Sequence, residues 1–288
     1  MDWMTGMQRA MEYLEAHLTE EISYEQVAKC AACSPFYFQK IFSILCGVPL
    51  GEYVRNRRLT LAGGEIVSTQ EKIIDIALKY GYESPESFTR AFVRFHGVSP
   101  SEARRNGAQL RYFSPLSVTL TMKGGTFMEV KIVKKPAFMV MGKTEFHDVK
   151  DEENRNSIPA FWARCHKDKT VQKLLERAGE KSFLFGICFA PKQGEDRFAY
   201  TIAAEISPTE EIPAGFEAIT IPARSWAVFS CVGAMPQAMQ EKWHEICTEF
   251  FPTSGYRPTY EMDIEGYTAG DMSSAQYRSE IWIPIDMT

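Results

Sequence analysis

A duplicated segment in the first third of the chain constrains the fold more than any other feature of the sequence. Residues 34–56 align without gaps on residues 84–106, and nine of the 23 paired positions are identical. The identical pairs include a Ser-Pro dipeptide at the start of each copy, two phenylalanines and a glycine. Agreement at such landmarks indicates that the two segments are copies of one structural unit.

Each copy has the pattern of a capped helix. Ser34 and Ser84 are both followed by proline, which predicts a helix N-cap and a first helical residue. Gly47 and Gly97 predict the ends of these helices. Between them, apolar residues recur at the i, i+3, i+4, i+7 spacing of a buried helix face. They are Phe38, Ile41, Phe42 and Leu45 in the first copy and Phe88, Ala91, Phe92 and Phe95 in the second.

A shorter helical segment precedes each capped helix, at 25–31 and at 72–81. A short helix, a turn and a second capped helix form the pattern of a helix-turn-helix. The polar faces of the capped helices carry Gln, Lys, Thr and Arg side chains, which can contact base edges or phosphates in a major groove. On spacing alone, two hairpins of a helical bundle with solvated polar faces stay open as the alternative.

Length and charge favour two separate cores and leave nucleic acid possible. The 288 residues exceed a typical single domain, so two compact units are expected. The net charge of −5 does not favour nucleic acid. However, the charges of residues 1–112 cancel, with thirteen of each sign, so the whole excess belongs to 113–288. Eight arginines lie between Arg55 and Arg111, and a local basic surface is therefore possible.

Several classes of protein are disfavoured. No run approaches the ~20 apolar residues of a membrane-spanning helix, and the first residues lack the pattern of a secretory signal. We therefore expect a cytoplasmic protein with no membrane partner, whose seven cysteines stay reduced. No P-loop, GxSxG or HExxH motif occurs, and we expect no catalytic residue, no cofactor and no metal site.

Residues 7–106 resemble the DNA-binding domain of the AraC/XylS family of transcription activators. The segment 73–104 is similar to the family signature almost throughout, and 50–67 is similar to the helix that joins two helix-turn-helix subdomains. Glycines at 63 and 64 depart from the pattern of a long joining helix. In a helix interior each glycine costs up to ~1 kcal/mol of stability relative to alanine. The resemblance implies double-stranded DNA and RNA polymerase as partners. It also implies groove-facing residues in two recognition helices: Phe36, Gln39 and Lys40 in the first, and Pro85, Glu86, Thr89 and Arg90 in the second. At its position Glu86 would face a phosphate or a cytosine amino group rather than guanine.

The rest of the chain changes character. Residues 107–127 predict an interdomain segment that contains a short strand at 117–122. Strand, helix and two strands, repeated, predict an α+β fold with a mainly antiparallel sheet. We therefore expect an all-α domain at 1–108, an interdomain segment at 109–127 and an α+β domain at 128–288. The β-rich runs are 128–146, 182–190, 198–206, 218–233 and 277–285, and the helical patterns are 158–179 and 236–251.

Residues 128–286 resemble the gyrase-inhibitor-like effector-binding domain found in multidrug-sensing regulators, with landmarks at 221–233, 250–256 and 280–285. The resemblance implies a small-molecule effector and a glutamate, here Glu261, at the floor of an aromatic-walled cleft. A carboxylate in apolar surroundings favours a cation, which aromatic faces also attract. Alternatively, Glu261 forms a surface salt bridge and the aromatic residues are core. The candidate walls are Trp162, Phe185, Tyr200, Trp226, Tyr260 and Trp282.

These patterns predict a sequence-specific transcription regulator, acting as an activator, that responds to a small cationic or amphipathic ligand. Two alternatives stay open. The chain could be a constitutive activator whose second domain contacts a protein, or the second domain could hydrolyse a reactive small molecule through Glu261.

Overall fold

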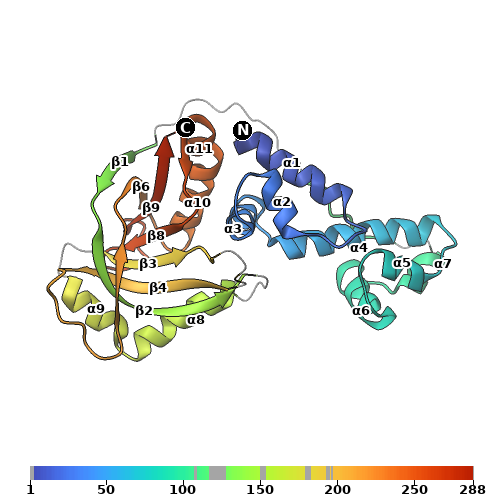
Figure 1. Cartoon of the computed structure of the whole chain (residues 1–288). Helices are drawn as coiled ribbons and strands as arrows, with labels where there is room; N and C mark the ends of the chain where they lie inside the picture. Colours follow the sequence, from blue (N-terminus) through green and yellow to red (C-terminus); the bar gives the residue numbers. More distant parts are fainter. Residues whose placement is uncertain are drawn as a thin grey trace. The chain divides into compact units, whose positions relative to one another are not determined.

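The computed structural model describes residues 3–106, 109–116, 128–149, 154–178, 183–192, 195 and 197–287. The chain divides into two compact units, Met1–Thr121 and Met122–Thr288 (Figure 1). The first unit is helical, and the described strands all lie in the second. The predicted fold classes, an all-α region followed by an antiparallel α+β region, are therefore confirmed. Among the described residues, no helix combines the length and the apolar character that crossing a membrane requires.

The two copies of the repeat form matching helices of twelve residues. Ser34 and Ser84 are N-caps, whose hydroxyl oxygens accept hydrogen bonds from the backbone N–H three residues later. Gly47 and Gly97 end the helices with φ of 70° and 83°, as expected where only glycine adopts this conformation without strain. The helices of unit 1 are α1 (Trp3–Ala16), α2 (Tyr24–Cys30), α3 (Pro35–Cys46), α4 (Leu50–Ser68), α5 (Ile73–Lys79), α6 (Pro85–His96) and α7 (Pro100–Asn106).

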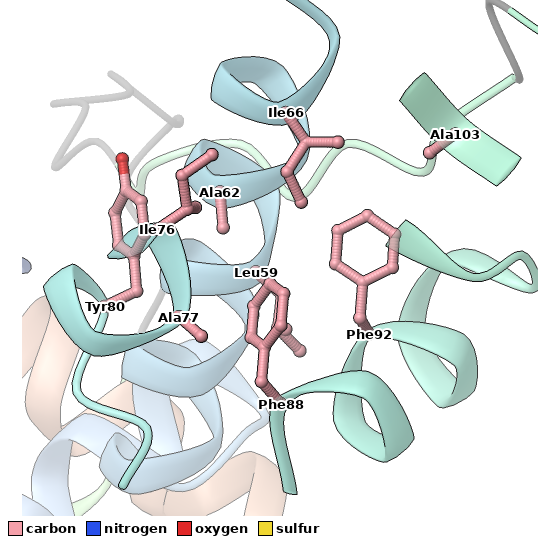
Figure 2. Close-up of a cluster of buried hydrophobic side chains, with 9 residues drawn as sticks. All are labelled: Leu59, Ala62, Ile66, Ile76, Ala77, Tyr80, Phe88, Phe92 and Ala103. Atoms are coloured by element: carbon pink, nitrogen blue, oxygen red, sulfur yellow. The ribbon is translucent and has the colours of Figure 1, made fainter. Parts of the chain in front are cut away.

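The long helix α4 joins the two helix-turn-helix subdomains, as predicted, and supplies core residues to both (Figure 1). In the second subdomain its residues Leu59, Ala62 and Ile66 pack on α5, α6 and α7. Figure 2 shows Phe88 and Phe92 of α6 directed toward these α4 side chains, with Ala103 of α7 closing the cluster. The predicted apolar stripe of α6 is therefore the buried face of this subdomain.

Residues 109–116 run along α4 and are bound to it at several points. Arg57 Nη1 donates to the Phe113 carbonyl at 2.7 Å, and the Phe113 N–H donates to Thr60 Oγ1 at 3.1 Å. The Leu116 N–H donates to the Tyr53 hydroxyl at 3.2 Å, and Leu110 packs against the second core. This part of the expected interdomain segment is packed on unit 1. The expected strand at 117–122 lies outside the described residues.

Unit 2 is built on a nine-stranded sheet with antiparallel pairs, in the order β1-β6-β9-β8-β3-β4-β2-β5, with β7 paired to β9. Two of the predicted runs are each split into two strands, because prolines 136 and 222 interrupt them. The strands are β1 (Val130–Lys135), β2 (Phe138–Asp148), β3 (Leu184–Phe189), β4 (Arg197–Ile206), β5 (Glu217–Ile221), β6 (Arg224–Val232), β7 (Tyr256–Pro258), β8 (Met262–Tyr267) and β9 (Arg278–Met287).

The strand order reveals an internal duplication in unit 2. Exchanging β1 with β5, β2 with β6, β3 with β8 and β4 with β9 reverses the order of these eight strands and leaves every pairing among them in place. Each half therefore has two strands, a helical segment and two strands, with the short β7 as an addition in the second half, and the halves meet where β3 pairs with β8. The predicted repeat of strand, helix and two strands is confirmed, with one additional strand at the start of each half.

The helical pattern at 158–179 is confirmed, but it is divided between two helices by a break that the sequence did not predict. The structure has α8 (Asn154–Lys167) and α9 (Thr170–Ala178). Lys169 between them has φ of 64°, and the Asp168 carboxylate accepts the Thr170 N–H at 3.0 Å as a cap for α9. The second pattern, 236–251, forms α10 (Gln237–Glu245), the π-helical turn η1 (Ile246–Phe250) and α11 (Phe251–Thr253).

Candidate functional site

The outer face of α6 carries polar side chains that the fold does not use. Glu86, Arg90 and Arg94 are exposed, whereas Phe88 and Phe92 on the other face are fully buried. Thr89 is half-buried, and its hydroxyl donates to the Pro85 carbonyl at 2.7 Å. Within the described ranges, neither Arg90 nor Arg94 has an intramolecular partner, so both guanidinium groups are available to an acceptor outside the chain.

The matching face of α3 is less exposed. Gln39 and Lys40 are half-buried, and Gln39 Nε2 donates to the Pro35 carbonyl at 3.4 Å, at the same helix position as the Thr89 contact. Phe36 departs from the expectation for a groove-facing residue, because only 8% of its surface is exposed. The two expected recognition helices therefore share their backbone geometry but differ in the charge and exposure of their outer faces.

Glu261 does not lie at the floor of an aromatic cleft, and this corrects the sequence-based expectation. It precedes β8 and forms a bidentate ion pair with Arg224, whose Nη2 is 2.9 Å from Oε2. The Glu261 side chain is 46% exposed. Its neighbour Tyr260 has φ of 63°, so the chain turns sharply there. The surface salt bridge, one of the two alternatives for Glu261, is what the structure contains.

The expected aromatic walls lie on opposite faces of the sheet. Cross-strand partners and residues two apart share a face. Trp282 is paired with Ile264 and with Val228, two residues from Trp226, and Ile264 is paired with Ile187, two residues from Phe185. Phe185 and Trp226 belong to one buried cluster, and the partly buried Trp282 packs against it, with its ring 6.1 Å from that of Trp226. These residues contribute to the core.

Trp162 and Tyr200 lie on the other face, which the helices cover. Tyr200 is paired with Cys188, the residue next to Ile187, and therefore points away from the Trp282 cluster. Trp162 of α8 donates its indole N–H to the Tyr200 hydroxyl at 3.1 Å. Gly186 on β3 leaves room for this hydroxyl, since a Cβ at that position would overlap it.

A carboxylate that is not among the predicted site residues lies on this helix-covered face. Glu265 of β8 accepts hydrogen bonds from the Trp243 indole N–H of α10 at 3.0 Å and from the Tyr267 hydroxyl at 2.7 Å. The Tyr267 and Trp162 rings meet edge to face with centroids 5.4 Å apart. We call these residues the Glu265 cluster: Trp162, Tyr200, Trp243, Glu265 and Tyr267.

The Glu265 cluster keeps its two tyrosines neutral. Burial raises the pKa of Tyr200 and of Tyr267 well above the usual value, and the negative charge of Glu265 raises both further. A half-buried carboxylate among neutral aromatic side chains has no cationic partner that the structure records in the described ranges. Such a site favours a ligand with a positive charge and apolar or aromatic surface.

Glu265 was missed because its strand was missed. The sequence MDIEGY of β8 contains two acidic residues and a glycine, all depleted in strands, so its β-propensity is weak. The signal was the alternation of Met262, Ile264 and Gly266 with Asp263, Glu265 and Tyr267, which places Glu265 on the face opposite Ile264.

Comparison with protein families matches both units. Residues 27–106 match the model of a helix-turn-helix domain, and residues 131–285 match the model of an integron-associated effector binding protein. The second match covers more than half of the chain.

Individual relatives agree with these matches. The chain is 38% identical over 89 residues to the HTH-type transcriptional activator AarP of Providencia stuartii, covering 31% of this chain and 66% of AarP. It is 37% identical over 98 residues to the regulatory protein SoxS of Salmonella typhimurium, covering 34% of this chain and 92% of SoxS. The chain thus spans just under two thirds of AarP. A solved structure, SAV2435 bound to tetraphenylphosphonium, matches with a TM-score of 0.49 and 24% identity, over 55% of this chain and 94% of SAV2435.

Two helix-turn-helix subdomains on one joining helix, followed by an antiparallel effector-binding fold, define a DNA-binding transcription regulator of two domains. The chain belongs to the AraC-type transcription regulators, and its second unit belongs to the integron-associated effector-binding family with a gyrase-inhibitor-like fold.

Proposed function

We propose that the chain is a ligand-controlled transcription activator that binds DNA through α3 and α6 and binds a small amphipathic cation at the Glu265 cluster. The proposal places the regulator in the cytoplasm, where its DNA is. The DNA-binding domain would extend through residue 116, because residues 109–116 hydrogen bond to α4. The effector-binding domain would begin near residue 128.

The DNA-contacting set is proposed from exposure and chemistry. Arg90 is the strongest candidate, because an exposed arginine without an intramolecular partner can bind guanine in a bidentate manner. Pro85, Glu86 and Thr89 would contact the same major groove as Arg90. Gln39 and Lys40 would contact the neighbouring groove, about 34 Å away on the same face of the duplex. Phe36 is buried, so its role in this set would be to position α3 rather than to contact bases.

The effector site rests on a single observation: Glu265 is a half-buried carboxylate that receives hydrogen bonds from two aromatic residues and lies beside two more. Trp162 and Tyr200 keep their proposed roles as walls. Phe185, Trp226 and Trp282 lie in the core of the opposite face, and Glu261 and Tyr260 lie outside the cluster.

Calorimetric titration of the full chain with tetraphenylphosphonium, a lipophilic cation, tests the site. Glu265→Gln should weaken binding at least tenfold, because an interaction with a charged group contributes about 1.5–3 kcal/mol. Glu261→Gln is the matched control: it removes the same charge four residues away, at an exposed ion pair, and should leave the affinity unchanged.

Equal binding by wild type and Glu265→Gln, or loss of binding in Glu261→Gln alone, would contradict the proposed site. If no cation binds the wild type, a second domain that contacts a protein becomes the better account. Mass spectrometry of the recovered ligand tests the remaining alternative, since chemical conversion would indicate a hydrolase.

Activation would require contact with RNA polymerase, and support for it comes from the activator AarP among the relatives. Transcription in a purified system from a promoter that carries the selected binding site tests this directly. The proposal predicts more transcript with the protein than without it, and a further change when the cation is added.

A further inference from the structure

Arg58 lies on α4 where the two helix-turn-helix subdomains adjoin. Its side chain is half-buried and reaches into the first subdomain. Nε donates to the Leu18 carbonyl at 2.7 Å, and Nη2 donates to the Glu20 carbonyl at 2.6 Å. Both acceptors belong to the segment between α1 and α2. A guanidinium presents its donors in a fixed plane, so two such bonds fix the orientation of the group.

The same guanidinium lies against the second subdomain. A Cβ built on Gly81 would stand 2.6 Å from Arg58 Nη1 and 3.3 Å from Cζ, so this glycine allows the close approach. Gly81 has φ of 79° and lies in the turn between α5 and α6. Arg58 is therefore held between a segment of the first subdomain and the helix-turn-helix turn of the second.

The surrounding charges agree with this position. Burial raises the pKa of Tyr24 in α2, and the charge of Arg58 opposes that rise. Burial likewise raises the pKa of Tyr82, next to Gly81, and the charges of Arg55 and Arg58 oppose it. One guanidinium thus acts electrostatically on a tyrosine from each subdomain.

A joining helix by itself leaves the angle between two small subdomains poorly determined. In a protein that reads two successive grooves, that angle decides how far apart the two contacted sites must lie. We propose that Arg58 is a positioning residue that fixes the relative orientation of α3 and α6 and thereby restricts the protein to one separation of its two DNA half-sites. This inference rests on the proposed DNA binding.

The chain contains a matched control for this role. Arg104 of α7 makes the same kind of contacts, with Nε donating to the Ile66 carbonyl at 3.2 Å and Nη2 to the Glu71 carbonyl at 2.6 Å. All of these groups belong to the second subdomain and the end of α4 next to it. Loss of Arg104 therefore removes an equivalent set of hydrogen bonds without removing a contact between the subdomains.

The test uses the full chain and a binding site selected from random DNA with the wild-type protein. Fluorescence anisotropy then measures affinity for that site and for sites with one base pair added or removed between the half-sites. Each base pair moves one half-site by about 3.4 Å and rotates it by roughly a tenth of a turn. The wild type should lose at least tenfold in affinity on either change.

Arg58→Ala should lower affinity for the original site and reduce the loss on respacing to about threefold or less. Arg58→Lys, which keeps the charge but not the planar pair of donors, should give an intermediate loss. Arg104→Ala should keep the wild-type dependence on spacing. Circular dichroism verifies that each variant is folded, and if Arg58→Ala does not fold, Arg58→Lys decides the question.

The inference is overturned if a folded Arg58 variant discriminates spacing as the wild type does, or if Arg104→Ala loses discrimination equally. A wild type that selects no DNA sequence overturns the proposed function instead, and the inference with it.

Discussion

At the residue scale, buried charge in the first unit is balanced at one site and avoided at another. The Arg57 side chain is only 5% exposed, and Glu15 accepts hydrogen bonds from its Nε and Nη2. The Glu15 hydrogen bond raises the pKa of Arg57, so the guanidinium stays charged. A buried charge with such a partner is retained, whereas the same charge without it would be strongly destabilising.

His96 is another buried titratable residue of unit 1, and its burial favours the neutral form. It lies between α6 and α4, where its Nε2 donates to the Leu59 carbonyl at 3.0 Å. Burial lowers the pKa of His96, the Leu59 hydrogen bond opposes this, and the charge of Arg111 lowers the pKa further. Its Nδ1 is buried and has no partner in the described part of the chain. Protonation would therefore leave a second donor, and a charge, without an acceptor.

The second subdomain should lose stability as the pH falls below about 6.5, the ordinary pKa of histidine. The unfolded chain binds the His96 proton more readily than the folded chain does. The contribution of His96 to the free energy of unfolding therefore decreases as the pH is lowered from 6.5 to the pKa of the folded state, and it is constant above pH 6.5. Hydrogen exchange of the α6 amides, corrected for intrinsic rate, measures this. Protection at pH 5.5 should be lower than at pH 7.5.

His96→Gln should abolish that difference between the two pH values. His147→Gln serves as the control, because His147 also has a pKa lowered by burial but lies in unit 2. A pH dependence in α6 that survives in His96→Gln would show that other groups cause it.

At the scale of elements, the packing around α4 explains one of the two glycines that depart from the family pattern. Its two adjacent glycines have different surroundings. A Cβ on Gly63 would lie 2.9 Å from His96 Nε2 and 3.1 Å from Leu110 Cδ1, whereas a Cβ on Gly64 would meet nothing within 4 Å. Gly63 therefore lets α6 and the 109–116 segment approach α4 closely, and Gly64 serves no such purpose.

Substitution of these two glycines should have opposite effects. Gly64→Ala should stabilise the domain by up to ~1 kcal/mol through helix propensity. Gly63→Ala should destabilise it despite the same propensity gain, because His96 would have to move from its hydrogen bond with Leu59. Denaturant unfolding with helix content as the signal compares them, and equal changes in midpoint for the two variants would contradict the packing described here.

Elements with strong and uncontested local signals were predicted, whereas elements with competing or weak local signals were not. Serine caps, N1 prolines and terminal glycines defined α3 and α6 to the residue, because their signals lie within each helix. The break at Lys169 depends on a side-chain cap by Asp168, which competed with an uninterrupted helical pattern. Strand β8 is stabilised by pairing with β3 and β9 rather than by its own propensity.

The two candidate sites also differ in how far the sequence predicts them. The outer face of α6 follows directly from helix periodicity, and the predicted residues Glu86 and Arg90 are exposed there. The proposed effector site depends on which sheet face each strand residue occupies, and this requires the register. A shift of four residues, from Glu261 to Glu265, exchanges a surface ion pair for a carboxylate among aromatic rings.

At the scale of the whole molecule, both units are duplications that join their halves through a shared element. In unit 1 the shared element is α4, and in unit 2 it is the continuous sheet. The chain leaves unit 1 along α4, where Arg57, Thr60 and Tyr53 bind residues 113–116.

The central claim is that the two copies of the repeat contact two successive grooves on one face of DNA. Hydroxyl-radical footprinting of the full chain on a site selected from random DNA tests it most directly. The account predicts two protected patches one helical turn apart. Gln39→Ala should weaken one patch, and Arg90→Ala should weaken the other and cost ~1–3 kcal/mol in binding. A single patch, or two patches that respond alike to both substitutions, would contradict it.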